Sequence, residues 1–183
     1  MLATKRITWT QPPEANTLDA LYELEELERE PEGNEARVDE LRSQLATVMA
    51  EEWRFTVGGL SVLTKSRYFA HLRNTEPYLA ATWPDEDDPE RTRVTLISYQ
   101  AALVLASISY VEWRKRAILD GDSAEGWEPA QLPAGWDSVE GYMAAAPASL
   151  HDALSAAAST INPQVMMRGS NEHAKKYGGV SGS

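Results

Sequence analysis

The feature that most constrains the fold is an uncharged run of 18 residues from Val94 to Val111. A membrane-spanning helix needs about 20 predominantly apolar residues, and this run also contains five Ser, Thr and Gln side chains. We therefore expect a buried core helix and not a membrane span. We expect this helix to end near Leu119, before Asp120-Gly121-Asp122, with a short strand at Arg93–Ile97 left open as its start.

Acidic side chains are concentrated near the start of the chain. Residues 14–52 hold 13 acidic and 3 basic side chains, within a whole-chain net charge of −11. A segment of this charge repels phosphate, so nucleic acid is not the expected ligand, and a basic protein surface is a more natural partner.

The same segment has the pattern of two amphipathic helices. The first begins at Asn16 or Thr17, which can cap it, and its apolar stripe comprises Leu18, Leu21, Tyr22, Leu24 and Leu27. The turn at residues 30–34 contains Pro and Gly. The second helix is expected from Glu35 to Trp53, with an a/d seam formed by Val38, Leu41, Leu45 and Val48. Together they predict an antiparallel helical hairpin. This hairpin is interpreted either as a structural arm with a solvated acidic face or as a docking arm.

Two short segments favour β structure. Residues 7–10 favour a strand that Pro12-Pro13 ends. Phe55 and Val57 alternate before Gly58-Gly59, and Leu60 and Val62 alternate after it, which predicts a β-hairpin over Phe55–Val62.

The remaining segments predict further helices over 64–83, 138–146 and 148–160. Pro77 is expected to interrupt the first of these, Ser138 to cap the second, and Pro147 to start the third, with Asn162-Pro163 ending it. The predicted fold class is mainly α: a helical bundle with an N-terminal helical hairpin and a small β-hairpin. We expect an N-terminal segment and arm over 1–53, a globular domain over 54–160 and a flexible tail over 161–183.

The sequence contains no pattern typical of a catalytic or metal site. There is no Cys, which excludes thiolate ligands and a cysteine nucleophile. His71, His151 and His173 lack metal-ligand spacing. The Asp85–Asp88 cluster and Asp120-Gly121-Asp122 do not match a calcium loop. We expect no catalytic residue, no metal and no cofactor, and the protein is interpreted as not an enzyme.

Arg114-Lys115-Arg116 is the one compact basic cluster in the sequence. Near the end of the expected core helix, these charges would complement the helix dipole. The alternative is a docking contact to an acidic surface. The candidate partner-binding residues are therefore Glu25, Glu28, Val38, Leu41, Leu45, Val48, Arg114, Lys115 and Arg116.

Residues 54–160 resemble small tail-assembly proteins of tailed bacteriophages, in particular tail assembly chaperones. The resemblance comprises the predicted hairpin Phe55–Val62, the core helix Gln100–Ile108, a loop with Trp and Pro, and the Pro-started helix Pro147–Leu154. It implies a protein that binds the tape-measure protein and keeps it soluble while the tail tube grows. The acidic hairpin and the Ala-rich C-terminal part depart from that pattern.

The leading hypothesis is a non-catalytic assembly or structural protein, either a tail assembly chaperone or a component of the virus particle. The alternatives are an acidic regulatory module that binds other proteins and an enzyme without a recognised motif. Expected partners are tape-measure or other tail proteins, with a homo-oligomer left open, and neither nucleic acid nor membrane is expected. The N-terminus lacks the pattern of a secretory signal, so the host cytoplasm or the assembled particle is the expected location.

Overall fold

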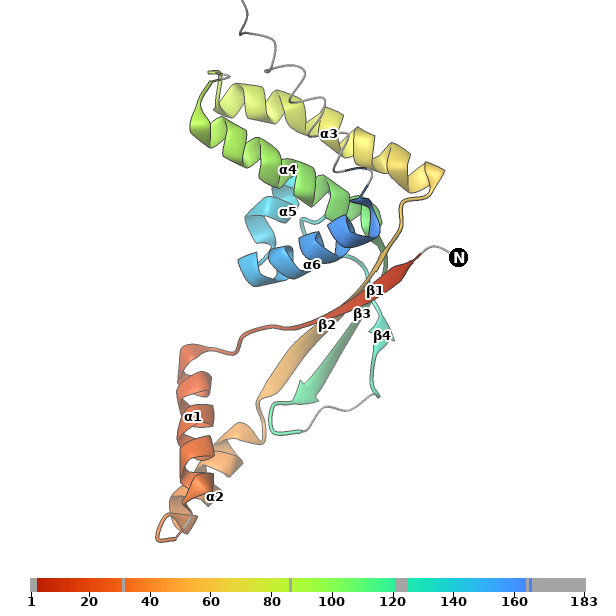
Figure 1. Cartoon of the computed structure of the whole chain (residues 1–183). Helices are drawn as coiled ribbons and strands as arrows, with labels where there is room; N and C mark the ends of the chain where they lie inside the picture. Colours follow the sequence, from red (N-terminus) through yellow and green to blue (C-terminus); the bar gives the residue numbers. More distant parts are fainter. Residues whose placement is uncertain (1–2, 31, 86, 121–124, 164, 166–183) are drawn as a thin grey trace, which may run out of the picture. The chain divides into compact units, whose positions relative to one another are not determined.

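The computed structural model describes residues 3–30, 32–85, 87–120, 125–163 and 165 (Figure 1). Over these residues, six helices accompany a four-stranded antiparallel sheet whose strand order is β1-β2-β3-β4. The fold class is therefore α+β. The expectation of a mainly helical bundle with a minor hairpin is wrong, because all of one long strand (residues 108–117) and the first half of another (residues 49–53) occupy segments that were predicted to be helical.

The described helices follow one another in pairs, and the pairs are separated by strands. Their order is β1 (Thr4–Thr10), α1 (Ala15–Arg29), α2 (Glu35–Leu45), β2 (Met49–Gly58), α3 (Val62–Thr82), α4 (Pro89–Ser107), β3 (Ile108–Ala117), β4 (Glu128–Pro129), α5 (Val139–Ala145) and α6 (Ala148–Ile161).

Backbone hydrogen bonds at the strand ends define the register of the sheet. The Gln11 N–H donates to the Glu51 carbonyl at 2.9 Å, and the Gly59 N–H donates to the Ala3 carbonyl at 3.0 Å. On the other side of β2, the Ile118 N–H donates to the Val48 carbonyl at 2.9 Å. In β3 and β4, Glu112 lies opposite Pro129 and Trp113 opposite Glu128.

Residues 101–107 of the uncharged run are all buried, but Leu96 and Tyr110 are exposed, so the expected burial holds only in part. The run also does not form one helix. Helix α4 ends at Ser107 and the chain continues as β3 from Ile108 to Ala117. The predicted helix end near Leu119 is therefore wrong, and so is the suggested strand at 93–97, which lies within α4. Residues 108–113 are rich in β-branched and aromatic side chains (Ile108, Tyr110, Val111 and Trp113), residue types that favour a strand.

The predicted β-hairpin over Phe55–Val62 is also wrong. Strand β2 ends at Gly58, and α3 begins at Val62 with Ser61 as its N-cap, whose side chain accepts from the Thr64 N–H at 3.2 Å. Neither Gly58 nor Gly59 has a positive φ, so the two-residue turn that such a hairpin needs is absent. The alternating side chains before Gly58 pair with β1 and β3 instead.

The second arm helix is shorter than predicted. Helix α2 ends at Leu45, and β2 starts at Met49, so residues 49–53 are strand and not helix. Met49, Ala50 and the two glutamates are good helix formers, but here they pair with two neighbouring strands, and this tertiary pairing overrides local propensity.

The other predicted elements mostly agree with the structure. The strand at 7–10 is part of β1, and the helices near 138–146 and 148–160 correspond to α5 and α6. Ser138 caps α5 by accepting from the Gly141 N–H at 3.0 Å. Helix α3 continues through Pro77, so the predicted interruption is wrong. Residues 164 and 166–183 of the predicted tail lie outside the described residues.

The chain forms two compact units. Unit 1 comprises residues 1–7, 55–110 and 131–183, and unit 2 comprises residues 8–54 and 111–130. Strands β1, β2 and β3 each contribute residues to both units. No helix in the described part of the chain is both long and apolar enough to cross a membrane.

The core of unit 1 is built where α3, α5 and α6 pack on α4. Residues 101–107 of α4 are all buried, and their many Ala and Ser side chains permit close helix approach. An aromatic column extends this core: Phe55 stacks on Trp136 with ring centroids 5.3 Å apart, and Trp136 meets the edge of Tyr142 at 4.6 Å. The Tyr142 hydroxyl contacts His151 Nδ1 at 3.0 Å.

Buried Asn162 joins three segments of unit 1. Its Oδ1 accepts from the Leu60 N–H at 2.8 Å, and its Nδ2 is within 3.3 Å of the Gly58 carbonyl and Ser107 Oγ. One side chain therefore satisfies polar groups at the end of β2 and at the end of α4, and it lies at the C-cap of α6.

Candidate protein-binding surface

The arm of unit 2 consists of α1 and α2, and it has its own small core. Val38, Leu41 and Leu45 are buried with Ala20 and Leu24. Val48 packs against this cluster, although it follows the end of α2. The predicted apolar seam is thus formed. Its side chains pack inside the arm, where they are not exposed to a partner.

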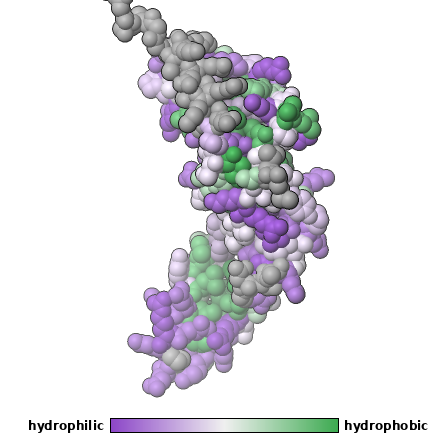
Figure 2. All heavy atoms as spheres, turned by 45° about the vertical axis from the view of Figure 1, so that its right-hand side comes forward, coloured by the Kyte–Doolittle hydropathy of each residue, from purple (hydrophilic) through white to green (hydrophobic). Residues whose placement is uncertain are grey.

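Partly buried side chains extend the arm's apolar cluster to its surface. They are Leu21, Leu27, Val48 and Ile118. Figure 2 shows hydrophobic atoms along one face of the arm, bordered by hydrophilic atoms. Tyr22 on α1 is 64% exposed, so the arm presents an aromatic ring as well as aliphatic side chains.

Ion pairs connect the two arm helices. Arg37 on α2 bridges to Glu23 on α1 at 2.7 Å, and Arg42 bridges to Glu28 at 2.8 Å. Glu25 pairs with Arg29 within α1. Because the pairs are exposed, solvent screens them and they contribute little to stability. Their main effect is to neutralise charge on the arm. Glu25 and Glu28, two of the predicted binding residues, are both engaged in this way.

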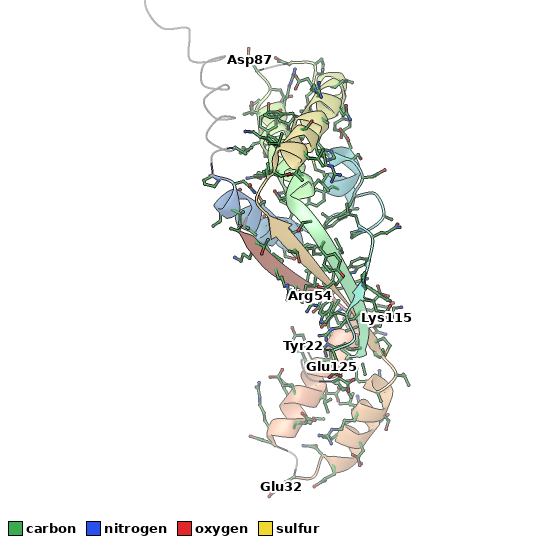
Figure 3. All side chains as sticks on the ribbon, turned by 90° about the vertical axis from the view of Figure 1, so that its right-hand side faces the viewer. Tyr22, Glu32, Arg54, Asp87, Lys115 and Glu125 are labelled. Atoms are coloured by element: carbon green, nitrogen blue, oxygen red, sulfur yellow. The ribbon has the colours of Figure 1, made fainter. Side chains whose placement is uncertain are left out.

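Most carboxylates of the arm remain unneutralised. Residues 15–45 carry ten carboxylates and three arginines, and four of those carboxylates are in ion pairs. The six others are exposed and make no ion pair within the described part of the chain: Asp19, Glu26, Glu30, Glu32, Glu35 and Asp39. Glu32 lies at the tip of the arm (Figure 3).

The basic cluster has a different place from the predicted one. Arg114, Lys115 and Arg116 lie on β3 and not at a helix end, so the helix-dipole interpretation is wrong. Arg114 and Arg116 both bridge to Glu52 on β2, at 2.6 and 2.8 Å, and Lys115 bridges to Glu51 at 2.9 Å. The basic cluster therefore neutralises the last two acidic residues of the 14–52 segment.

Arg114 and Glu52 form the most deeply buried ion pair of unit 2, with side chains 3% and 4% exposed. Burial opposes ionisation of Glu52, but the hydrogen bonds from Arg116 and Arg114 outweigh it and lower the pKa of this carboxyl below its usual range. Thr10 Oγ1 on β1 also donates to Glu52 Oε1 at 3.3 Å. The cluster thus binds β1, β2 and β3 together.

Trp127 covers this ionic face of the sheet. The guanidinium carbons of Arg54 and Arg114 lie 4.2 and 4.4 Å from the centre of its ring, a geometry that favours cation–π attraction. Arg54 also bridges to Glu112 at 2.7 Å. Figure 3 labels Arg54 and Lys115 on the neighbouring strands β2 and β3. These contacts hold the segment around Trp127 against the sheet.

The opposite face of the sheet in unit 2 carries a row of tryptophans. The strand register places Trp9 opposite Trp53 and Trp53 opposite Trp113, and directly opposed residues share a face. The rings of Trp53 and Trp113 are tilted, with centroids 6.4 Å apart. All three tryptophans are partly exposed. Met49 lies on the same face, four residues before Trp53 on β2, and is 50% exposed. This row was not predicted from the sequence, because the three tryptophans align only in a register that requires β2 and β3 to be strands.

The described histidines and acidic residues are possible metal ligands by residue type. Among the residues that the structure describes, no three His, Asp or Glu side chains gather closely enough to hold a metal ion. Burial lowers the pKa of His71 and of His151. Asp88 serves as the N-cap of α4, accepting from the Glu90 N–H at 2.8 Å. His173 lies outside the described residues.

Fold and surface together describe an α+β protein with an acidic helical arm. Comparisons with protein-family models, with curated proteins and with solved structures found no match to this chain.

Proposed function

We propose that this protein is a non-catalytic, protein-binding assembly protein whose arm engages a basic surface of its partner. The proposal is supported by six exposed, unneutralised carboxylates on α1, on α2 and in the turn that joins them. The three arginines of the arm all form ion pairs with arm glutamates. Glu51 and Glu52 form ion pairs with basic side chains of β3. The remaining negative charge therefore faces solvent and is available to a basic partner.

Charge and apolar surface have separate roles in this proposal. Long-range attraction accelerates encounter and selects basic partners, whereas burial of apolar area supplies most of the affinity. Exposed Tyr22 and the partly buried Leu21 and Leu27 provide such area on α1. The expected partner is a segment whose apolar side chains are flanked by Lys or Arg.

The resemblance of residues 54–160 to phage tail-assembly proteins supports a more specific form of the proposal. The partner would then be a tape-measure or another tail protein, and the protein would act as a tail assembly chaperone or as a component of the particle. Co-expression separates these two roles. A chaperone would raise the soluble fraction of a tape-measure protein, whereas a particle component would be recovered in purified particles.

A matched pair of charge variants tests the arm directly. In the arm variant, Glu26, Glu32, Glu35 and Asp39 are replaced by Gln or Asn. In the control variant, four exposed carboxylates elsewhere are replaced in the same way: Asp87, Glu128, Asp137 and Asp152. The two variants have the same net charge, so any difference in binding reports on the position of the charge.

The probe is a labelled helical peptide with a Leu face flanked by Lys, and its binding is followed by fluorescence anisotropy at several salt concentrations. We expect the arm variant to bind roughly tenfold more weakly and with a smaller salt dependence, and the control variant to lose about twofold or less. Equal losses in both variants would show that the arm is only a solvated structural element.

A further inference from the structure

Among the residues that the structure describes, β1 is an edge strand, because the sheet has the order β1-β2-β3-β4. It is seven residues long, and five of its side chains are exposed: Thr4, Lys5, Arg6, Thr8 and Thr10. The opposite edge, β4, has only two residues. A long exposed edge offers unpaired backbone groups to another strand, so β1 is the edge on which strand addition would occur.

The register with β2 determines which backbone groups of β1 point outward. The groups of Ala3 and Gln11 are directed to β2, as their bonds to Gly59 and Glu51 show. In an antiparallel strand this direction alternates. The backbone N–H and C=O groups of the odd-numbered residues therefore point toward β2. Those of the even-numbered residues point to the free edge: Thr4, Arg6, Thr8 and Thr10.

Ile7 is the central residue of β1, and a threonine lies at each end of the strand. Thr4-Lys5-Arg6 precedes Ile7, and Thr8-Trp9-Thr10 follows it. In an antiparallel pair of two such strands centred on Ile7, Thr4 lies opposite Thr10, Lys5 opposite Trp9 and Arg6 opposite Thr8. The even-numbered residues then form the hydrogen-bonded pairs, with about eight backbone hydrogen bonds at two per pair.

Side-chain chemistry favours this register. Each Lys5 ammonium lies opposite a Trp9 ring, the aromatic side chain that attracts a cation best. Ile7 lies opposite Ile7 in a pair without backbone bonds, where side chains approach most closely.

The two neighbouring registers are less favourable. Centring on Arg6 places the two Arg6 side chains directly opposite each other, which is destabilising. Centring on Thr8 places Thr4 opposite Pro12, which has no N–H to donate. The charges and the hydrogen-bonding groups of β1 therefore favour the same alignment, the one centred on Ile7.

We propose that β1 pairs antiparallel with β1 of a second copy of this chain, centred on Ile7, and joins the two sheets into one continuous sheet. The interface does not involve the arm, so this inference and the proposed function can fail separately. The partner at this edge is a second copy because one sequence supplies both halves of every favourable pair.

A cysteine cross-link tests the register. The chain has no Cys, so a single introduced thiol is unique. In Ile7→Cys, the two opposed Cα atoms would lie about 4.5 Å apart, within the range of a disulfide. We expect mild oxidation to give a covalent dimer of Ile7→Cys, and little dimer from Thr4→Cys or from Glu32→Cys at the arm tip. Equal cross-linking in all three, or none in Ile7→Cys, would overturn the proposal.

Light scattering after size exclusion gives the second measurement. Thr8→Pro removes an outward N–H and leaves the bonds to β2 in place, since proline is tolerated on the free side of an edge strand. Thr8→Ala keeps that N–H and is the matched control. We expect dimers for the wild type and for Thr8→Ala, and monomers for Thr8→Pro with an unchanged circular dichroism spectrum. A monomeric wild type, or a dimer that persists in folded Thr8→Pro, would contradict the proposal.

Discussion

At the scale of single residues, unit 2 depends on one buried carboxylate. The Glu52 carboxylate forms ion pairs with Arg114 and Arg116, and it accepts a hydrogen bond from Thr10. Its neighbour Glu51 makes a similar but exposed pair with Lys115. Side chains of a strand alternate between its two faces. The two adjacent glutamates therefore differ in burial, and we expect them to differ in their contribution to the free energy of unfolding.

Replacing Glu52 by Gln should destabilise the protein by about 3–5 kcal/mol, because Arg114 would be left as an uncompensated buried charge. Glu51→Gln is the control, and its exposed pair should cost about 1 kcal/mol or less. Urea unfolding of both variants at pH 7 gives the comparison. Similar losses for the two glutamates would mean that burial does not determine the strength of these pairs.

Asn162 has a comparable role in unit 1. Replacing it by Ala removes the partner of the Leu60 N–H and of buried Ser107 Oγ, and we expect a loss of about 2–3 kcal/mol from the unsatisfied groups. Exposed Thr160→Ala on the same helix, which loses only a bond to the Ala156 carbonyl, should lose less than about 1 kcal/mol. A thermal melt of each variant distinguishes a polar junction from a simple helix end.

At the scale of elements, the sequence predicted helices well wherever caps and turns are local. Ser138 caps α5 and Pro147 precedes α6, as their residue types indicated. Strands β2 and β3 were missed because their stability comes from neighbours distant in sequence. The arm seam could be predicted from the spacing of Val38, Leu41 and Leu45. The tryptophan row and the Glu52 cluster could not, since both require the strand register.

Helix α5 also depends on a close backbone contact that no pattern in the sequence announces. A Cβ added at Gly141 would lie 2.0 Å from the Gly135 carbonyl oxygen, so the turn at Gly135 or the first turn of α5 must move. We expect Gly141→Ala to destabilise the protein by about 1–3 kcal/mol, as overpacking does, despite its better helix propensity. Ala144→Ser on the exposed side of α5 is the control. A more stable Gly141→Ala protein in chemical unfolding would rule out this contact.

At the scale of the whole molecule, some acidic side chains form ion pairs within the fold and others face solvent. The acidic segment 14–52 contains an arm whose charge faces solvent and two strand residues whose charge is paired. Deleting residues 14–52 would therefore remove the start of β2 and Glu52 together with the arm. Substitutions on α1 and α2 are the better test of arm function, because they leave the sheet intact.

The lowered pKa values of two histidines predict how the stability of the protein depends on pH. Burial lowers the pKa of His71, with Arg67 acting in the same direction and Glu140 against it. Burial also lowers the pKa of His151, and Asp152 opposes it. Between the ordinary histidine pKa near 6.5 and the lower folded values, the unfolded chain binds more protons than the folded one, so stability rises with pH.

We therefore expect the free energy of unfolding to be constant above about pH 7 and to fall as the pH drops below about 6.5, through the folded pKa values of the histidines. The lowered pKa of Glu52 adds a further loss only at more acidic pH. Urea unfolding between pH 5 and 7.5 measures this slope, and the double variant His71→Gln, His151→Gln should flatten it. An undiminished slope in the folded double variant would assign the effect to the carboxylates instead, since after the substitution they would be the groups left to titrate on the acid side.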